Sequence, residues 1–138
     1  YRRSIALFPT AEGHTFLGWV LSFSGRMEEA IECCKSAIEV DPDFGNPYND
    51  IAAYLIRLGR PAEAVAWLER AKGARRYDCA HFPYYNLGRV FEPLGRFDEG
   101  LREYQGALDR ARERAIPYPH AELAIRRLES LLRRRAQP

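Results

Sequence analysis

The sequence has few cysteines and no long apolar run. None of its apolar stretches approaches the ~20 residues that a membrane-spanning helix needs, so no membrane span is predicted. No signal-peptide pattern is visible. The cysteines are Cys33, Cys34 and Cys79, an odd number with one adjacent pair, which does not fit a disulfide framework. These absences predict a soluble, cytoplasmic protein with reduced thiols.

Catalytic motifs are also lacking. The sequence has no glycine-rich phosphate loop, no nucleophile elbow and no helical H-E-x-x-H. The cysteines together with His14 and His81 do not have the spacing of zinc motifs. The sequence therefore predicts a protein that is not an enzyme, with no cofactor and no metal site.

Positive charge gathers at the C-terminal end, where residues 110–138 hold eight arginines and three glutamates. Such a cluster is a candidate surface for RNA, DNA or an acidic membrane. No aromatic stacking residues accompany these arginines, and the net charge of the whole chain is only +2. Nucleic-acid binding is therefore a disfavoured alternative.

A repeated pattern surrounds three glycines, Gly25, Gly59 and Gly95, which are 34 and 36 residues apart. An aliphatic residue, a small residue and a large apolar residue precede each glycine at matching spacings: Leu17-Gly18-Leu21, Ile51-Ala52-Leu55 and Leu87-Gly88-Phe91. A small, a larger and another small residue follow each: Ala30-Cys34-Ala37, Ala64-Leu68-Ala71 and Gly100-Tyr104-Ala107. Spacings of three and four place such residues on one face of a helix.

This pattern predicts a helical hairpin that occurs three times. Small residues allow the two helices of a hairpin to approach closely, and the larger residues fill the gaps. Each repeated glycine is expected to end a first helix in the left-handed conformation. Asn46 is expected to cap the next helix with Pro47 as its first residue, and Pro61 is expected to open the helix after that. Because one hairpin cannot bury its apolar face alone, the hairpins are expected to stack.

The pattern resembles the tetratricopeptide repeat, whose 34-residue signature is W-x2-L-G-x2-Y…A-x3-F…P. Tyr48 and Tyr84 match its leading aromatic residue, and Pro42 matches the closing proline of the first unit. The sequence departs from the signature at His14, Cys34, Gly100, Arg76 and Arg112. The resemblance implies an all-α fold, a right-handed superhelix of antiparallel hairpins with a C-terminal capping helix.

On this interpretation residues 1–138 are a single domain of repeats. Its expected parts are the end of a preceding repeat at 1–10, repeats at 11–44, 45–78 and 81–114, and a capping helix at 117–135. The capping helix has an apolar stripe formed by Ala121, Ala124, Ile125, Leu128, Leu131 and Leu132. The arginines of this helix are expected on the opposite, solvated face: Arg126, Arg127, Arg133, Arg134 and Arg135.

The stretch 73–86 contains the two extra residues of the longer interval. It is expected to be a loop that carries, among others, Arg75, Arg76 and His81. Loops on repeat scaffolds often carry binding sites. A lengthening that only redirects the third hairpin is the favoured interpretation, since surface loops tolerate insertion.

The resemblance also implies the site, because the first helices of such hairpins line a concave groove that holds a peptide or a helix. Carried over by position, the expected peptide-binding residues are Thr15, Trp19, Phe23, Asn49, Ile56, Arg57, Phe82, Tyr85 and Arg89. Glu12, Ser22, Asn46, Ala53 and Glu92 are further candidates on the same helices. Tryptophan, tyrosine and arginine are the residues that dominate binding hot spots.

One known kind of ligand does not fit. Chaperone-binding members of the family grip a terminal carboxylate with lysine, asparagine and arginine side chains. The corresponding positions here are Thr15, Trp19, Asp50, Phe82 and Asn86, which lack that chemistry. An anionic peptide group is still expected to suit Arg57 and Arg89.

The sequence thus predicts a non-catalytic scaffold or adaptor that binds a protein or peptide in its groove. Two alternatives stay open besides nucleic-acid binding. One is a self-associating module, and hence a homo-oligomer. The other is a regulatory segment of a larger protein.

Overall fold

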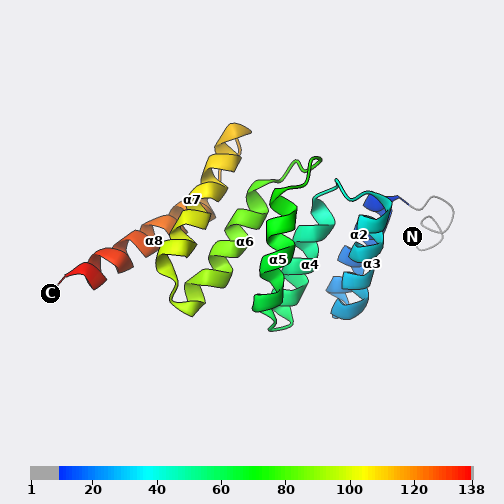
Figure 1. Ribbon diagram of the computed structural model, residues 1–138, viewed down its shortest axis with the longest axis horizontal. Coiled ribbons are helices and arrows are strands. Elements are labelled where there is room, and N and C mark those ends of the chain that lie inside the picture. Colours follow the sequence, from blue (N-terminus) through cyan, green and yellow to red (C-terminus); the bar gives the residue numbers. More distant parts are fainter. Residues whose placement is uncertain (1–9, 138) are drawn as a thin grey trace. The chain divides into compact units, whose positions relative to one another are not determined.

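A computed structural model describes residues 10–137 of the chain, which form helices and no strand (Figure 1). The α-helices are α2 (Ala11–Phe23), α3 (Met27–Val40), α4 (Asn46–Arg57), α5 (Pro61–Lys72), α6 (His81–Phe91), α7 (Phe97–Glu113) and α8 (Pro119–Ala136), and a 3₁₀ helix, η1 (Glu92–Leu94), follows α6. No helix in this part of the chain is long and apolar enough to cross a bilayer. Of the expected preceding repeat at 1–10, all but Thr10 lies outside the described residues.

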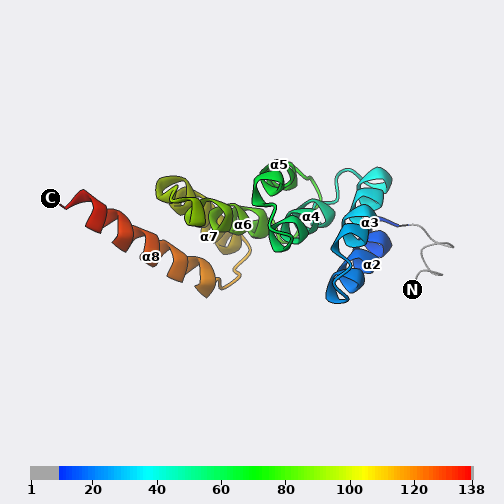
Figure 2. The ribbon, with the colours of Figure 1, turned by 90° about the horizontal axis from the view of Figure 1, so that it is seen from below.

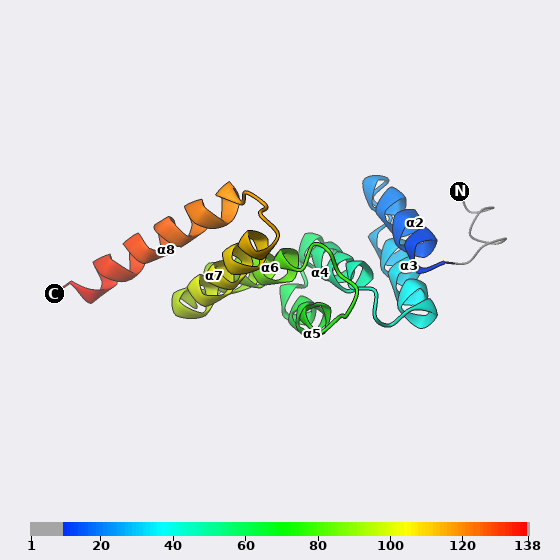
Figure 3. The same ribbon diagram turned by 90° about the horizontal axis from the view of Figure 1, so that it is seen from above.

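The described helices belong to two compact units, α2 to α5 before residue 79 and α6 to α8 after it. In the first unit α2 packs on α3 and α4 packs on α5, and α3 also packs on α4 (Figures 1 and 2). In the second unit α6 packs on α7, and α8 packs on α7 (Figure 3). The three predicted hairpins are therefore confirmed as α2–α3, α4–α5 and α6–α7.

Gly25 and Gly59 follow the ends of α2 and α4 as predicted, whereas Gly95 ends η1, the 3₁₀ helix that follows α6. Gly25, Gly59 and Gly95 have φ of 74°, 76° and 76°, and a Cβ added at any of them would meet nothing within 4 Å. Glycine is favoured there for its backbone conformation alone. Gly88 differs, because a Cβ at this position would lie 2.4 Å from the ring of Tyr104. That glycine allows α6 and α7 to approach closely.

The residues predicted to fill the hairpins form the core. The small residues Ala30, Ala37, Ala64 and Ala107 are fully buried, and Ala71 is 1% exposed. The larger residues of the pattern, Cys34, Leu68 and Tyr104, are 0%, 0% and 1% exposed. Matched positions in all three hairpins are thus buried by the same geometry.

The start of α4 differs from the prediction. Gly45 is the N-cap, Asn46 lies inside the helix as its first residue, and Pro47 follows it. Gly45 cannot carry a larger side chain, because a Cβ there would lie 2.4 Å from the ring of Tyr77. The cap is therefore set by the packing of a distant loop rather than by a side-chain hydrogen bond from Asn46. Pro61 is the first residue of α5, as predicted.

The expected loop at 73–86 is shorter than predicted, because α6 begins at His81. Its first half is tied to the connection between α3 and α4. The Gly45 N–H donates to the Arg76 carbonyl (3.0 Å), and the Arg76 N–H donates to the Asp43 carbonyl (2.9 Å). The Arg76 guanidinium also contacts Asp41 at 2.7 Å and stacks 4.3 Å above the Phe44 ring. This part of the loop therefore stabilises the first unit.

Helix α8 covers the last hairpin as a capping helix should. Ala121, Ala124 and Leu128 are buried, and Tyr104 of α7 shares a cluster with the last two. One arginine of the opposite face is not simply solvated. Arg127 makes two hydrogen bonds of 2.7 Å to the Glu92 carboxylate, which also accepts a 2.9 Å bond from the Tyr104 hydroxyl. These bonds lower the pKa of Glu92, with the Arg127 bond as the largest cause.

Candidate functional site

Helix α2 exposes a row of aromatic side chains. Phe16, Trp19 and Phe23 are 43%, 49% and 70% exposed. Their spacing of three and four places them on one side of the helix, and the Trp19 ring lies 5.6 Å from that of Phe16 and 4.6 Å from that of Phe23. The row is held together by ring contacts, yet much of its apolar surface faces solvent.

The other predicted residues of the first unit differ in exposure. Arg57 is exposed at the end of α4, and Ile56 is partly buried. Thr15 and Asn49 are only 8% and 7% exposed. The Thr15 hydroxyl donates to the Ala11 carbonyl at 2.7 Å, so its oxygen can still accept a hydrogen bond.

In the second unit, α6 carries the predicted residues Phe82, Tyr85 and Arg89. Phe82 is 40% exposed and Arg89 is exposed, with a weak 3.4 Å contact from its Nη1 to the Asn86 Oδ1. Tyr85 is partly buried, because its ring lies 5.4 Å from that of Tyr104 and 5.3 Å from that of Tyr118. Its role is therefore mostly structural in this unit. Glu92, a further candidate, is occupied by Arg127.

A pocket of about 330 Å³ lies beside the aromatic row, between α2 and α4. It is lined by Glu12, Thr15, Phe16, Trp19, Phe44, Asn46 and Asp50. The four residues of α2 share one face at spacings of three and four, and Asn46 and Asp50 are four residues apart on α4. Two helix faces and the residue that precedes α4 by two positions thus form its walls.

Asp50 is the unusual residue of this pocket. Its side chain is partly buried, and no hydrogen bond or ion pair links it to another described residue. Loss of water around the carboxyl group raises its pKa from the usual 3.8 to about 7. Cys34 of α3 and Tyr54 of α4 are close enough for their pKa values to be raised further by the Asp50 charge, although burial is the larger cause for both. An unpaired carboxyl group therefore faces a pocket with aromatic walls.

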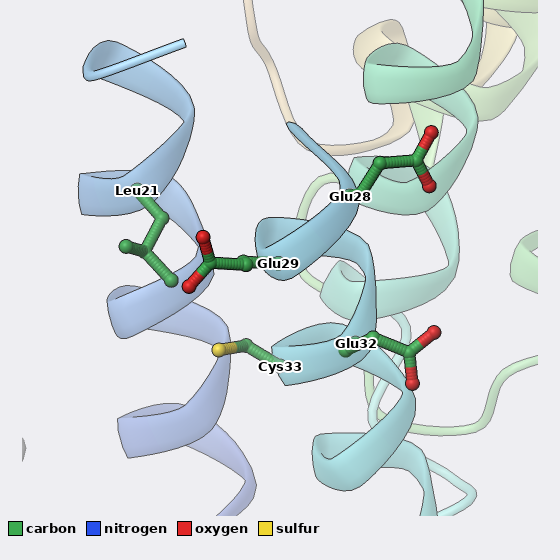
Figure 4. A pocket seen from close by; sticks show the side chains of 5 residues that line it. All are labelled: Leu21, Glu28, Glu29, Glu32 and Cys33. Atoms are coloured by element: carbon green, nitrogen blue, oxygen red, sulfur yellow. The ribbon is translucent and has the colours of Figure 1, made fainter. Parts of the chain in front are cut away.

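A second cavity, of about 360 Å³, lies at α2 and α3 and is lined by Leu21, Glu28, Glu29, Glu32 and Cys33. Figure 4 shows Glu29 and Cys33 projecting from α3 toward the α2 side, with Glu28 and Glu32 projecting to the other side. Glu29 is paired with Arg26, and the Glu28 carboxylate lies 3.3 Å from the Arg60 guanidinium. The Glu32 carboxylate lies 3.5 Å from the Lys35 ammonium, so each carboxylate of this cavity has a cationic partner, unlike Asp50.

The histidines and cysteines do not converge. Within residues 10–137, no group of three or more His, Cys, Asp or Glu side chains could hold a metal ion. His81, expected in the loop, is the buried first residue of α6, and its ring packs 4.9 Å from that of Tyr118. Burial raises the pKa of the Cys34 thiol, which opposes formation of a nucleophilic thiolate.

The sequence interpretation missed the role of Phe16, Phe44 and Asp50. From the sequence, Asp50 stands out only as a position unsuited to a carboxylate ligand. The available signal was the spacing of four between Asn46 and Asp50, next to the core residue Ile51, which indicates a polar face beside the core. The approach of α2 that closes the pocket could not be read from this spacing.

Comparisons with known proteins agree with this geometry. Three family models, each described as tetratricopeptide repeat, match residues 11–44, 48–76 and 83–114. TPR repeat-containing thioredoxin TTL4 of Arabidopsis thaliana is 31% identical over 80 residues, which are 57% of this chain and 10% of that protein. Human Tetratricopeptide repeat protein 7A is 27% identical over 109 residues, 78% of this chain and 12% of that protein. The chain thus spans about a tenth of the length of these curated relatives.

Solved structures show the same fold. The structure of pilF from Pseudomonas aeruginosa has a TM-score of 0.84 and 21% identity, over 96% of this chain and 59% of that chain. The first TPR of Spaghetti (RPAP3), bound to the HSP90 peptide SRMEEVD, has a TM-score of 0.76 and 20% identity, over 88% of this chain and 92% of that chain. With three family models that together cover most of its length, the chain belongs to the tetratricopeptide repeat family.

Proposed function

We propose that this chain is a non-catalytic protein-interaction module whose first helices, α2, α4 and α6, bind a peptide or a helix of a partner. The exposed aromatic row on α2 is the observation that carries the proposal. Soluble proteins rarely leave contiguous apolar surface exposed without a binding role. In the described part of the chain Cys33, Cys34 and Cys79 form no disulfide, which supports a reducing cytoplasmic setting.

Arg57 and Arg89 add exposed positive charge to the first helices of the second and third hairpins. Guanidinium groups bind carboxylates through paired hydrogen bonds. A partner with apolar anchors for the aromatic row and an acidic group for Arg57 would therefore match the first unit, and an acidic group for Arg89 would match the second.

A similar fold, the first TPR of RPAP3, has been solved with a peptide bound. That likeness supports a peptide-binding use of the fold. The likeness does not extend to the same peptide. The positions of a carboxylate-binding clamp hold residues that lack its chemistry, namely Thr15, Trp19, Asp50, Phe82 and Asn86.

Capture of partners from the source cell's lysate tests the proposal. The test variant is Trp19→Ala with Arg57→Glu and Arg89→Glu, three changes of exposed side chains. The matched control combines Val40→Ala, Arg102→Glu and Arg126→Glu, which make the same kinds of change on α3, α7 and α8. We expect a partner that binds the wild type and the control but not the test variant, with equal helicity by circular dichroism. Partners retained by the test variant would refute binding at the first helices.

Self-association is a second candidate, favoured by the same aromatic row together with Val20, which is 39% exposed. Sedimentation equilibrium over a wide concentration range tests it. A monomer mass at every concentration would exclude self-association, whereas a mass that rises with concentration and is lowered by Phe23→Ala would support it.

A further inference from the structure

The pocket between α2 and α4 has a charge opposite to that of the arginines on the proposed surface. The described residues that line it include two carboxylates, Glu12 and Asp50, and neither lysine nor arginine. Asp50 has no hydrogen-bond or ion-pair partner among the described residues. Arg76, beside the pocket, lies 2.7 Å from Asp41 and 3.4 Å from Glu12, so it partly neutralises Glu12 and leaves Asp50 as the carboxyl group of the pocket without a cationic partner.

The walls suit a cation for a second, independent reason. Phe16, Trp19 and Phe44 supply aromatic rings, and the face of such a ring attracts a positive charge. The chain already shows this preference at one of them, because the Arg76 guanidinium stacks 4.3 Å above the Phe44 ring. Trp19 is half exposed, and tryptophan binds cations more strongly than phenylalanine does.

Size and hydrogen-bond capacity agree with a side chain as the ligand. About 330 Å³ is at the lower end of the ~300–1,000 Å³ range of ligand pockets. The Thr15 hydroxyl oxygen and the Asn46 amide oxygen can accept hydrogen bonds next to the Asp50 carboxylate. Lysine and arginine side chains only donate, so donors of the ligand would face acceptors of the pocket.

We infer that this pocket receives a lysine or arginine side chain of the partner, held between Trp19 and the Asp50 carboxylate. The inference rests on the proposed function, since it names the chemistry that the partner presents to this surface. The partner then carries a basic residue among its apolar anchors, which distinguishes it from a purely acidic peptide.

The test uses a defined probe rather than the unidentified partner. N-acetyl-L-argininamide is titrated into the ¹⁵N-labelled chain at pH 8, where the Asp50 carboxyl group is mostly ionised. N-acetyl-L-citrullinamide serves as an uncharged probe of nearly the same shape. We expect saturable shifts of the Trp19 indole signal and of the Thr15, Asn46 and Asp50 amides with the arginine probe only. Loss of a charge-assisted hydrogen bond predicts that Asp50→Asn weakens this binding about tenfold or more. Asp109→Asn, the same change at an exposed carboxylate of α7, is expected to leave the affinity unchanged.

Equal shifts with both probes, no localised shift, or unchanged affinity in Asp50→Asn would overturn the inference. Its failure is separable from failure of the proposed function. If the lysate partner depends on the first helices but binds Asp50→Asn as tightly as the wild type, the proposed function stands and the cation pocket is refuted. If the arginine probe binds at Asp50 but every lysate partner still binds the variant altered on the first helices, the proposed function is refuted and the cation-binding pocket stands.

Discussion

Replacing Asp50 by asparagine is expected to stabilise the folded chain at alkaline pH. Asp50 is an unpaired carboxyl group whose pKa rises from 3.8 to about 7 through loss of water, so the folded chain holds a proton there that the unfolded chain releases. Stability from this group is complete below pH 3.8 and falls as the pH rises through about 7. Asparagine keeps the shape and has no charge to desolvate.

The size of the effect follows from the pKa difference. A pKa raised from 3.8 to about 7 corresponds to about 4 kcal/mol of destabilisation well above pH 7. Burying the asparagine amide without a partner costs about 1–3 kcal/mol, which offsets part of the gain. A net increase of about 1–3 kcal/mol in the free energy of unfolding at pH 8 is therefore expected.

Urea unfolding followed by circular dichroism at pH 5 and pH 8 measures this difference. Cys34 of α3 and Tyr54 of α4 interact electrostatically with Asp50, and Glu12 of α2 lines the same pocket. Two arginines lie one residue further away, since Arg57 interacts with Tyr54 and Arg76 pairs with Glu12. Burial raises the pKa of Cys34 and of Tyr54, so neither ionises in this interval. The wild type should lose more stability than Asp50→Asn between the two pH values. A variant that is less stable than the wild type at pH 8 would refute the reasoning and indicate a structural partner for Asp50.

Two further predictions concern the second unit and the repeat glycines. Glu92→Gln is expected to lower the free energy of unfolding by about 1–2 kcal/mol at pH 7, because Arg127 loses a charged acceptor. Since the pKa of Glu92 is lowered, this stabilisation is lost as the pH falls through that pKa. Urea titrations that show equal losses at acidic and neutral pH would contradict the prediction. Gly88→Ala is expected to cost more than Gly59→Ala in the same assay, because a Cβ at Gly88 lies 2.4 Å from the Tyr104 ring whereas Gly59 has open space and φ of 76°. In Gly59→Ala, an alanine in the left-handed conformation costs about 1–2 kcal/mol. In Gly88→Ala, overpacking against the Tyr104 ring costs about 1–3 kcal/mol or more. Equal losses of stability in the two variants would show that α6 and α7 can separate without penalty.

The sequence determined the hairpins and their buried face. Spacings of three and four bring Ala30, Cys34 and Ala37 to one side of a helix. The repeated glycines mark the turn between the two helices of each hairpin, because their left-handed backbone disfavours other residues. The apolar stripe of α8 could be predicted for the same reason, because its residues also recur at helical spacing. These are local properties of the backbone, so they follow from the order of residues.

Tertiary structure decided the candidate site. Asp50 and Trp19 are 31 positions apart in the sequence, and only the packing of α2 beside α4 brings them to one pocket. A backbone hydrogen bond likewise joins Gly45 to Arg76, which are separated in the sequence by the α4–α5 hairpin. This contact accompanies an N-cap of α4 at Gly45 rather than at Asn46. Desolvation of a carboxyl group depends on every neighbour that removes water from it, and those neighbours come from separate helices. The charge and chemistry of the proposed pocket therefore belong to the assembled fold.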